Sequence, residues 1–157
     1  MNKLEYSIVI GAPREQVWDA MLSDETYRQW TEPFAPGSHY VGDWTEGSEI
    51  LFLGPGETSG TTGMVSRIRE NRRHEYISIE HLGVIENGVR RAGGEGAGAW
   101  SGALENYTFR DHPDGTEVLV DMDTLEEHAA AFEGMWPKAL ETLKAIAEAR
   151  AGAGARQ

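Results

Sequence analysis

Apolar and polar residues alternate at the start of the chain. Leu4, Tyr6, Ile8 and Ile10 occupy every second position of residues 3–10. Side chains of an extended strand point alternately to its two faces, so this spacing predicts a β-strand with one buried face.

Helical spacing follows this strand. Apolar residues recur three and four positions apart between Pro13 and Ser23, and a proline suits the first turn of a helix. Ser23 or Asp24 can cap a second short helix, which runs through Trp30 and ends before Pro33. The sequence therefore predicts two short helices directly after the first strand.

Residues 38–123 show no helical period and have the pattern of an antiparallel sheet. The strand candidates are residues 49–53, 64–70, 75–85, 104–110 and 116–123. The predicted breaks and turns are Gly54-Pro55-Gly56, Asn71, Asn87-Gly88 and Asp114-Gly115. Residues 92–99 are almost wholly Gly and Ala, which predicts a mobile loop.

The end of the chain predicts a long amphipathic helix. Apolar positions recur every three or four residues, at Leu125, Ala129, Phe132, Trp136, Ala139, Leu143, Ile146 and, at the end of the stripe, Arg150. Pro137 removes one backbone donor and is expected to bend this helix. Residues 152–157 read as a flexible tail, which leaves residues 1–151 as one domain.

Composition excludes several classes of chemistry and of partner. A length of 157 residues suits a single domain, and the chain has no cysteine, which excludes disulfides and thiolate chemistry. The net charge of −12 repels phosphate groups and argues against a nucleic-acid partner. No apolar run reaches the roughly 20 residues of a membrane span, and residues 1–11 lack a signal-peptide pattern, so we expect a cytoplasmic protein without membrane insertion.

The order of these elements predicts an α+β fold of the helix-grip type. A curved antiparallel sheet would wrap around the C-terminal helix, whose apolar face is too wide to stay exposed. The chain resembles the START-like (SRPBCC) superfamily, in particular the bacterial proteins grouped with activator homologues of the heat-shock chaperone ATPase (AHSA-like). The residues that carry this resemblance are Ala12-Pro13, Val17-Trp18, Trp30, Gly47, and residues 80–88, 106–109 and 135–140.

The resemblance covers nearly the whole chain and implies a cavity between the sheet and the last helix. It does not select an activity, because the superfamily includes lipid and polyketide carriers, aromatase/cyclases, hormone receptors and chaperone cofactors.

His81 is the leading polar candidate for this cavity. If Ile77 and Ile79 face the helix, the strand pleat sends His81 inward as well and turns Ser78 and Glu80 outward. The alternative is a structural histidine that hydrogen-bonds a neighbouring strand or Tyr107.

Glu105 depends on the orientation of its own strand. If the large side chains of Tyr107 and Phe109 face inward, Glu105 does so too, and its carboxylate would need a ligand or an internal partner. With the opposite orientation Glu105 lies on the surface. If the protein is an enzyme, His81, Glu105 and Tyr107 are the candidate acid and base groups.

The candidate ligand-binding residues are mainly aromatic. They suit a flat apolar ligand held by few polar groups, although each could equally be ordinary core. They are Trp30, Phe34, Trp44, Phe52, Ile79, His81, Tyr107, Phe132, Met135 and Trp136. Trp100, beside the glycine-rich loop, is a candidate lid hinge or a residue that caps the edge of the sheet.

No cofactor or metal is expected. Residues 94–98 contain a Gly-x-Gly-x-Gly run but lack the strand and helix of a dinucleotide site, and the five histidines lack the spacing of zinc ligands.

The leading hypothesis is a binder of a small hydrophobic molecule that is aromatic, polyketide-like or lipid-like. A cyclase, dehydratase or hydrolase that uses the same cavity is the second hypothesis. A protein-interaction module that assists a chaperone or a regulator is the third. The partners expected besides a small ligand are a chaperone or a second copy in a weak homodimer.

Overall fold

The alternating residues at the N-terminus form the expected strand, β1 (Asn2–Ile10), in the computed structural model. The structure describes residues 2–32, 37–55, 61–86, 89–91, 102–124 and 126–155. Expectations about Phe34, the Asn87-Gly88 turn, the 92–99 loop and Trp100 lie outside these ranges.

Two short helices follow β1, as predicted. Helix α1 spans Arg14–Leu22 and helix α2 spans Asp24–Trp30, with Ser23 between them. The indole Nε1 of Trp30 donates to the carbonyl oxygen of Met21 at 2.9 Å, and this contact fixes the angle between the two helices.

The other strands join β1 in one curved antiparallel sheet. They are β2 (His39–Gly42), β3 (Glu49–Pro55), β4 (Thr61–Arg72), β5 (Tyr76–Glu86), β6 (Val89–Arg91), β7 (Leu104–His112) and β8 (Gly115–Thr124). This eight-stranded sheet has the order β1-β8-β7-β5-β4-β3-β2, and β6 pairs with β5. The first strand therefore lies beside the last.

The break predicted at Asn71 is wrong. Asn71 remains within β4, where its side-chain amide donates to the carbonyl oxygen of Trp44 at 2.7 Å. The turn comes three residues later, at His74, which has a φ of 66°. Asparagine is common in turns, but here its amide binds a segment distant in the sequence, which the sequence pattern does not show.

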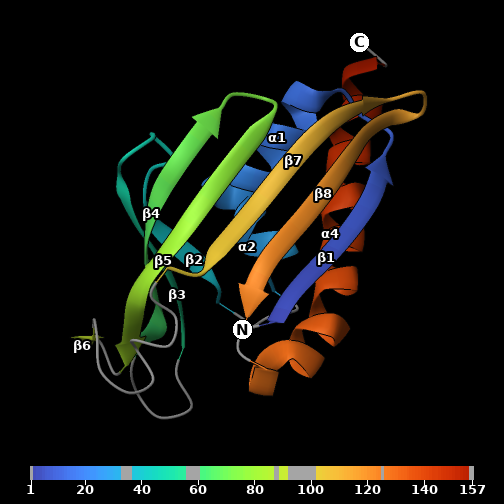
Figure 1. Ribbon diagram of the computed structural model, residues 1–157. Helices are drawn as coiled ribbons and strands as arrows, with labels where there is room; N and C mark the ends of the chain where they lie inside the picture. The colour runs from blue at the N-terminus through green and yellow to red at the C-terminus, as the bar shows by residue number, and fades with distance from the viewer. Residues whose placement is uncertain are drawn as a thin grey trace.

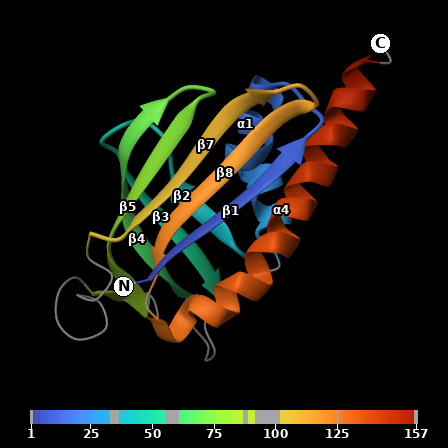
Figure 2. The same cartoon turned by 45° about the vertical axis from the view of Figure 1, so that its right-hand side comes forward.

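Helix α4 (Glu126–Ala155) covers the concave face on the β1 side and contains Pro137. Figures 1 and 2 show α1, α2 and α4 on the same side of the sheet, and Figure 2 shows α4 bent near its N-terminal end. Trp136 is only 3% exposed. The helix continues to Ala155, into the segment expected to be a tail, because alanine-rich sequence favours helix.

The core lies between the helices and the inner face of the sheet. Its fully buried members include Ile10, Met21, Trp30, Ile50, Ile68, Ile77, Ile79, Val118, Val120 and Leu143. None of the helices in the described part of the chain combines the length and apolar character needed to cross a bilayer.

The outer face of the sheet carries a row of polar side chains. Ser78 points away from the helices as expected, but it is buried by its neighbours. Its hydroxyl accepts from Arg69 at 3.3 Å and donates to Asn106 at 2.6 Å. The Asn106 amide then donates to Asp121 at 2.8 Å, and Asp121 lies 3.9 Å from Lys3. This row connects five strands.

Candidate functional site

His81 lies on the inner face of β5, two positions beyond Ile79. Its Nδ1 is 2.7 Å from the hydroxyl oxygen of Ser66, and its Nε2 is 3.3 Å from a carboxylate oxygen of Glu105. Both ring nitrogens therefore have a partner, which a buried imidazole requires.

Glu105 and Tyr107 lie two positions apart on β7 and share the inner face. The Tyr107 hydroxyl donates a short hydrogen bond to the Glu105 oxygen that does not contact His81. The inward orientation of Glu105 is thus the one observed. The Glu105 side chain retains 18% exposure, while Tyr107 is fully buried. We call Ser66, His81, Glu105 and Tyr107 the inner polar cluster.

Strand pairing explains how three strands supply this cluster. Ser66 on β4 lies opposite His81 on β5, just after a register shift at Val65. On the other side of β5, Ile79 lies opposite Glu105. The side chains of His81 and Glu105 meet along the diagonal between these positions, within the reach of long side chains.

The charge of Glu105 acts on two tyrosines. Burial raises the pKa of Tyr107 well above its usual value near 10, and the nearby carboxylate of Glu105 raises it further. Burial and then Glu105 also raise the pKa of Tyr27 on α2. Both hydroxyls therefore remain protonated at neutral pH.

Aromatic rings surround the inner polar cluster on two sides. On one side, Phe52 lies 6.4 Å from the His81 ring and 5.8 Å from Trp44. On the other side, Trp136 lies 6.1 Å from the Tyr107 ring and 5.9 Å from Trp30. The cluster therefore lies between two aromatic walls.

The candidate ligand-binding residues divide into two groups by burial. The buried group is Trp30, Ile79, His81, Tyr107 and Trp136, and the half-buried group is Trp44, Phe52, Phe132 and Met135. The structure brings both groups to the helix-covered side of the sheet, although Phe34 lies outside the described residues.

Tyr6 adds a polar atom that the sequence analysis did not single out. Its ring stacks on Trp136 with 6.1 Å between centroids. Its hydroxyl oxygen is buried and has no hydrogen-bond partner among the described residues. Burial followed by the charge of Glu133 raises the pKa of Tyr6. A buried hydroxyl without a partner is energetically costly, and a bound molecule could relieve that cost.

The hydrogen bonds that run from Ser66 through His81 to Glu105 resemble those of a hydrolase triad. The serine, however, is not placed to act as a nucleophile. Ser66 is 0% exposed, so a substrate carbonyl could not reach its hydroxyl oxygen. Within the described ranges, no group of three or more His, Asp or Glu residues could hold a metal ion. Glu105 is the accessible member of the cluster.

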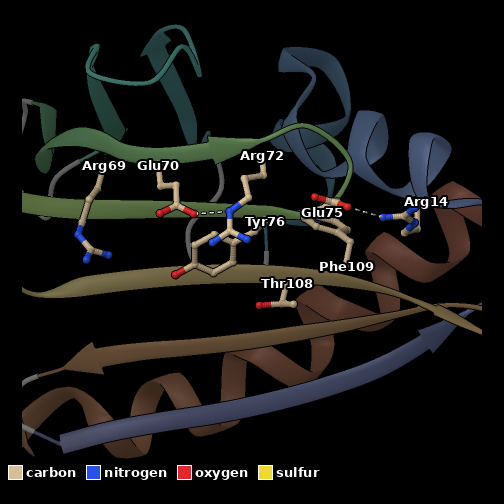
Figure 3. Close-up of a pocket in the computed structure, with 8 residues that line it drawn as sticks. All are labelled: Arg14, Arg69, Glu70, Arg72, Glu75, Tyr76, Thr108 and Phe109. Atoms are coloured by element: carbon tan, nitrogen blue, oxygen red, sulfur yellow. Dashed lines mark hydrogen bonds and ion pairs between the residues drawn. The ribbon is translucent and has the colours of Figure 1, made fainter.

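A second concavity lies on the outer face of the sheet. Figure 3 shows this open groove, which has a volume of about 490 Å³. Its lining residues come from α1, β4, β5, β7 and the turn before β5, and are Arg14, Arg69, Glu70, Arg72, Glu75, Tyr76, Thr108 and Phe109.

The outer groove is largely neutralised by its own side chains. Arg72 lies over the Tyr76 ring and forms an ion pair with Glu70 at 2.6 Å. Arg14 forms an ion pair with Asp111 at 2.9 Å. Because an anion would have to displace these carboxylates, the inner polar cluster is the stronger candidate site.

Comparison with known families identifies the relatives of this fold. A model of the family described as activator of Hsp90 ATPase homolog 1-like protein matches residues 11–148. The chain belongs to this family. The matched residues include the whole inner polar cluster and residues 126–148 of α4. They begin directly after β1, so β1 lies outside the match.

Solved structures support the family's fold here. A protein from Nitrosomonas europaea has a TM-score of 0.71 at 12% identity, with 94% of this chain and 95% of that chain covered. An AHSA1-like protein from Aeromonas hydrophila has a TM-score of 0.68 at 17% identity, with 95% of this chain and 94% of that chain covered. The Aha1 dimer from Colwellia psychrerythraea has a TM-score of 0.68 at 18% identity, with 94% of this chain and 97% of that chain covered. Curated proteins gave no match.

Besides Tyr6, two residues at or near the site of this family member were not expected from the sequence. Ser66 alternates with the inward Ile68, so strand parity alone could have placed it on the inner face. The register shift in β4 conceals its pairing with His81. Tyr27 has no comparable signal, because a helix of seven residues is too short to define a face.

Proposed function

We propose that this chain binds a small hydrophobic molecule, aromatic, polyketide-like or lipid-like, between the sheet and α4, and that it does so without chemistry. The observation that carries the proposal is the partial exposure of Glu105. This side chain belongs to the inner face and contacts buried His81 and Tyr107, yet 18% of it remains exposed. A molecule can therefore approach the inner polar cluster.

The half-buried aromatic residues support the same proposal. Trp44, Phe52 and Phe132 pack against the core but retain exposed surface. Such surface gains stability when an apolar ligand covers it, by roughly 25 cal/mol for each Å² removed from water. The Tyr6 hydroxyl, which has no hydrogen-bond partner among the described residues, offers one further polar contact.

The enzyme alternative has less support. Ser66 and His81 are closed off from solvent and satisfy one another, so the acid-base chemistry of the cluster would fall to Glu105 alone. A candidate base must lie within hydrogen-bond reach of the proton it removes. Glu105 can meet that requirement only with a proton of a bound ligand.

Native mass spectrometry of freshly purified protein is the first test, because an apolar site often retains a host molecule. We expect a one-to-one adduct whose mass does not change on incubation. A ligand mass that changes with time would support the enzyme alternative instead.

A fluorescence titration with Nile red, a neutral apolar dye, is the second test. We expect saturable one-to-one binding that weakens about tenfold or more in Phe52→Ala, since a buried phenyl group contributes about 1.5–3 kcal/mol. Val41→Ala is the control, because Val41 lies on neighbouring β2 and is 52% exposed. Equal affinity in both variants would contradict the proposed site.

A further inference from the structure

The hydrogen bonds of Glu105 limit what its ligand can be. An ionised carboxylate only accepts hydrogen bonds, and its two oxygens offer about four acceptor positions. His81 and Tyr107 occupy one position on each oxygen. The remaining positions can be filled only by a group that donates.

His81 can serve Glu105 without carrying a charge. In the tautomer with a proton on Nε2, the ring donates to Glu105 at 3.3 Å, and Nδ1 accepts from the Ser66 hydroxyl at 2.7 Å. This arrangement satisfies both ring nitrogens and leaves the negative charge of Glu105 in place.

No other protein cation compensates that charge in the described part of the chain. There, neither a lysine nor an arginine forms an ion pair with Glu105, and the buried polar residues are Ser, Thr, Asn and His. The field of Glu105 instead reaches Tyr27 and Tyr107, whose hydroxyls are neutral. A partly desolvated carboxylate gains from a cationic partner.

The surroundings of Glu105 are also suited to a cation. Phe52 lies beside the His81 ring and Trp136 beside the Tyr107 ring, so aromatic side chains, which attract organic cations, adjoin both neighbours of Glu105. The net charge of −12 adds a long-range field that favours positively charged molecules.

We infer that the ligand of the inner site is a hydrophobic amine, whose ammonium group donates to Glu105 and whose apolar body lies against the aromatic walls. This inference rests on the proposed function, because it names the ligand class for the same site. It predicts discrimination against neutral and acidic molecules of the same shape.

Three matched probes test the ligand class: 2-(1-naphthyl)ethylamine, 2-(1-naphthyl)ethanol and 1-naphthaleneacetic acid. We would measure their affinities by calorimetry at pH 7. The amine is expected to bind roughly tenfold to a hundredfold more tightly than the alcohol, as for a hydrogen bond to a charged group, and the acid most weakly.

Glu105→Gln removes the charge and keeps the side-chain shape. In this variant the amine and the alcohol should bind within about threefold of each other, with alcohol affinity near that of the unmodified protein. Glu5→Gln is the control, because it makes the same charge change at an exposed position on the other face of β1, and it should keep the amine preference. Circular dichroism would verify that both variants fold.

The outcomes separate the two proposals. Binding of the alcohol or the acid at least as tightly as the amine would overturn the ligand class and leave the proposed function intact. The same holds if Glu105→Gln keeps the full amine preference. If neither the three probes nor Nile red bind, both proposals are overturned. If Glu105→Gln does not fold, the ranking of the three probes on the unmodified protein still decides.

Discussion

One imidazole ring joins three strands at the centre of the site. Ser66 on β4, His81 on β5 and Glu105 on β7 are held together by the two nitrogens of His81. Such a buried group is stable only while every donor and acceptor has a partner. Each member of the cluster therefore depends on the others.

Ser66→Ala should lower the free energy of unfolding by about 1–3 kcal/mol, because it leaves Nδ1 of His81 without a partner in a buried position. Urea unfolding followed by circular dichroism measures this change. Ser7→Ala is the control, since Ser7 is exposed on β1, and it should change stability by less than about 0.5 kcal/mol. Equal effects would mean that the Ser66 hydroxyl contributes nothing specific.

Alkaline pH should destabilise the protein through Tyr27 and Tyr107. Their pKa values are raised by burial and by Glu105, so above pH 10 the folded state binds more protons than the unfolded state. Their contribution is complete below about pH 10 and decreases by about 1.4 kcal/mol per pH unit for each tyrosine as the pH rises. Absorbance at 295 nm should show that two of the five tyrosines ionise only when the chain unfolds. Full ionisation of a folded protein would contradict this assignment.

At the residue scale, strand parity predicted the inner face for His81, but it left two orientations open for Glu105 and Tyr107, of which the structure has the inward one. It could not predict which atoms meet, because that depends on the register between strands. The shift near Val65 and the irregularity between Ile68 and Glu70 both alter this register without an evident sequence signal.

At the scale of helices and strands, one large side chain of α4 joins this helix to several other elements. Trp136 contacts Tyr6 on β1, Tyr107 on β7 and Trp30 on α2, so it connects the terminal helix to three other elements. The wide apolar stripe of the sequence predicted this helix and its buried face. The short strand β2, with four residues, is at the lower limit of the length over which alternation can be recognised.

Trp136→Ala should lower the free energy of unfolding by about 3–5 kcal/mol, the range for removing a large core aromatic side chain. Chemical denaturation measures the loss. Glu141→Ala provides the control, because Glu141 is exposed on the same helix and should change stability by less than about 0.5 kcal/mol. A loss well under 1 kcal/mol for Trp136→Ala would refute the packing of α4.

At the scale of the whole molecule, the described surface is poor in apolar side chains. Val41 at 52% and Val89 at 56% are its exposed large hydrophobic residues. Stable dimers usually bury extended apolar patches, and two copies with a net charge of −12 repel each other.

We therefore expect light scattering at low micromolar concentration to give the monomer mass of 17.3 kDa. Any dimer should be weak and should strengthen with added salt, which screens the repulsion between copies. A stable mass of twice the monomer value in dilute solution would place an extensive interface outside the described surface.

The pairing of β1 with β8 has a consequence for synthesis of the chain. Ile10 pairs with Thr116, so the ribosome must add roughly a hundred residues, over about 5–20 s, before β1 meets its neighbour. Lys144 and Glu148 then bind the carbonyl oxygen of Val9 and the amide of Gly11. During that interval the backbone N–H and C=O groups of β1 have no neighbouring strand to bind. A nascent chain stopped at residue 114 should therefore be sensitive to protease and dependent on holding factors, whereas the released full-length chain should resist protease.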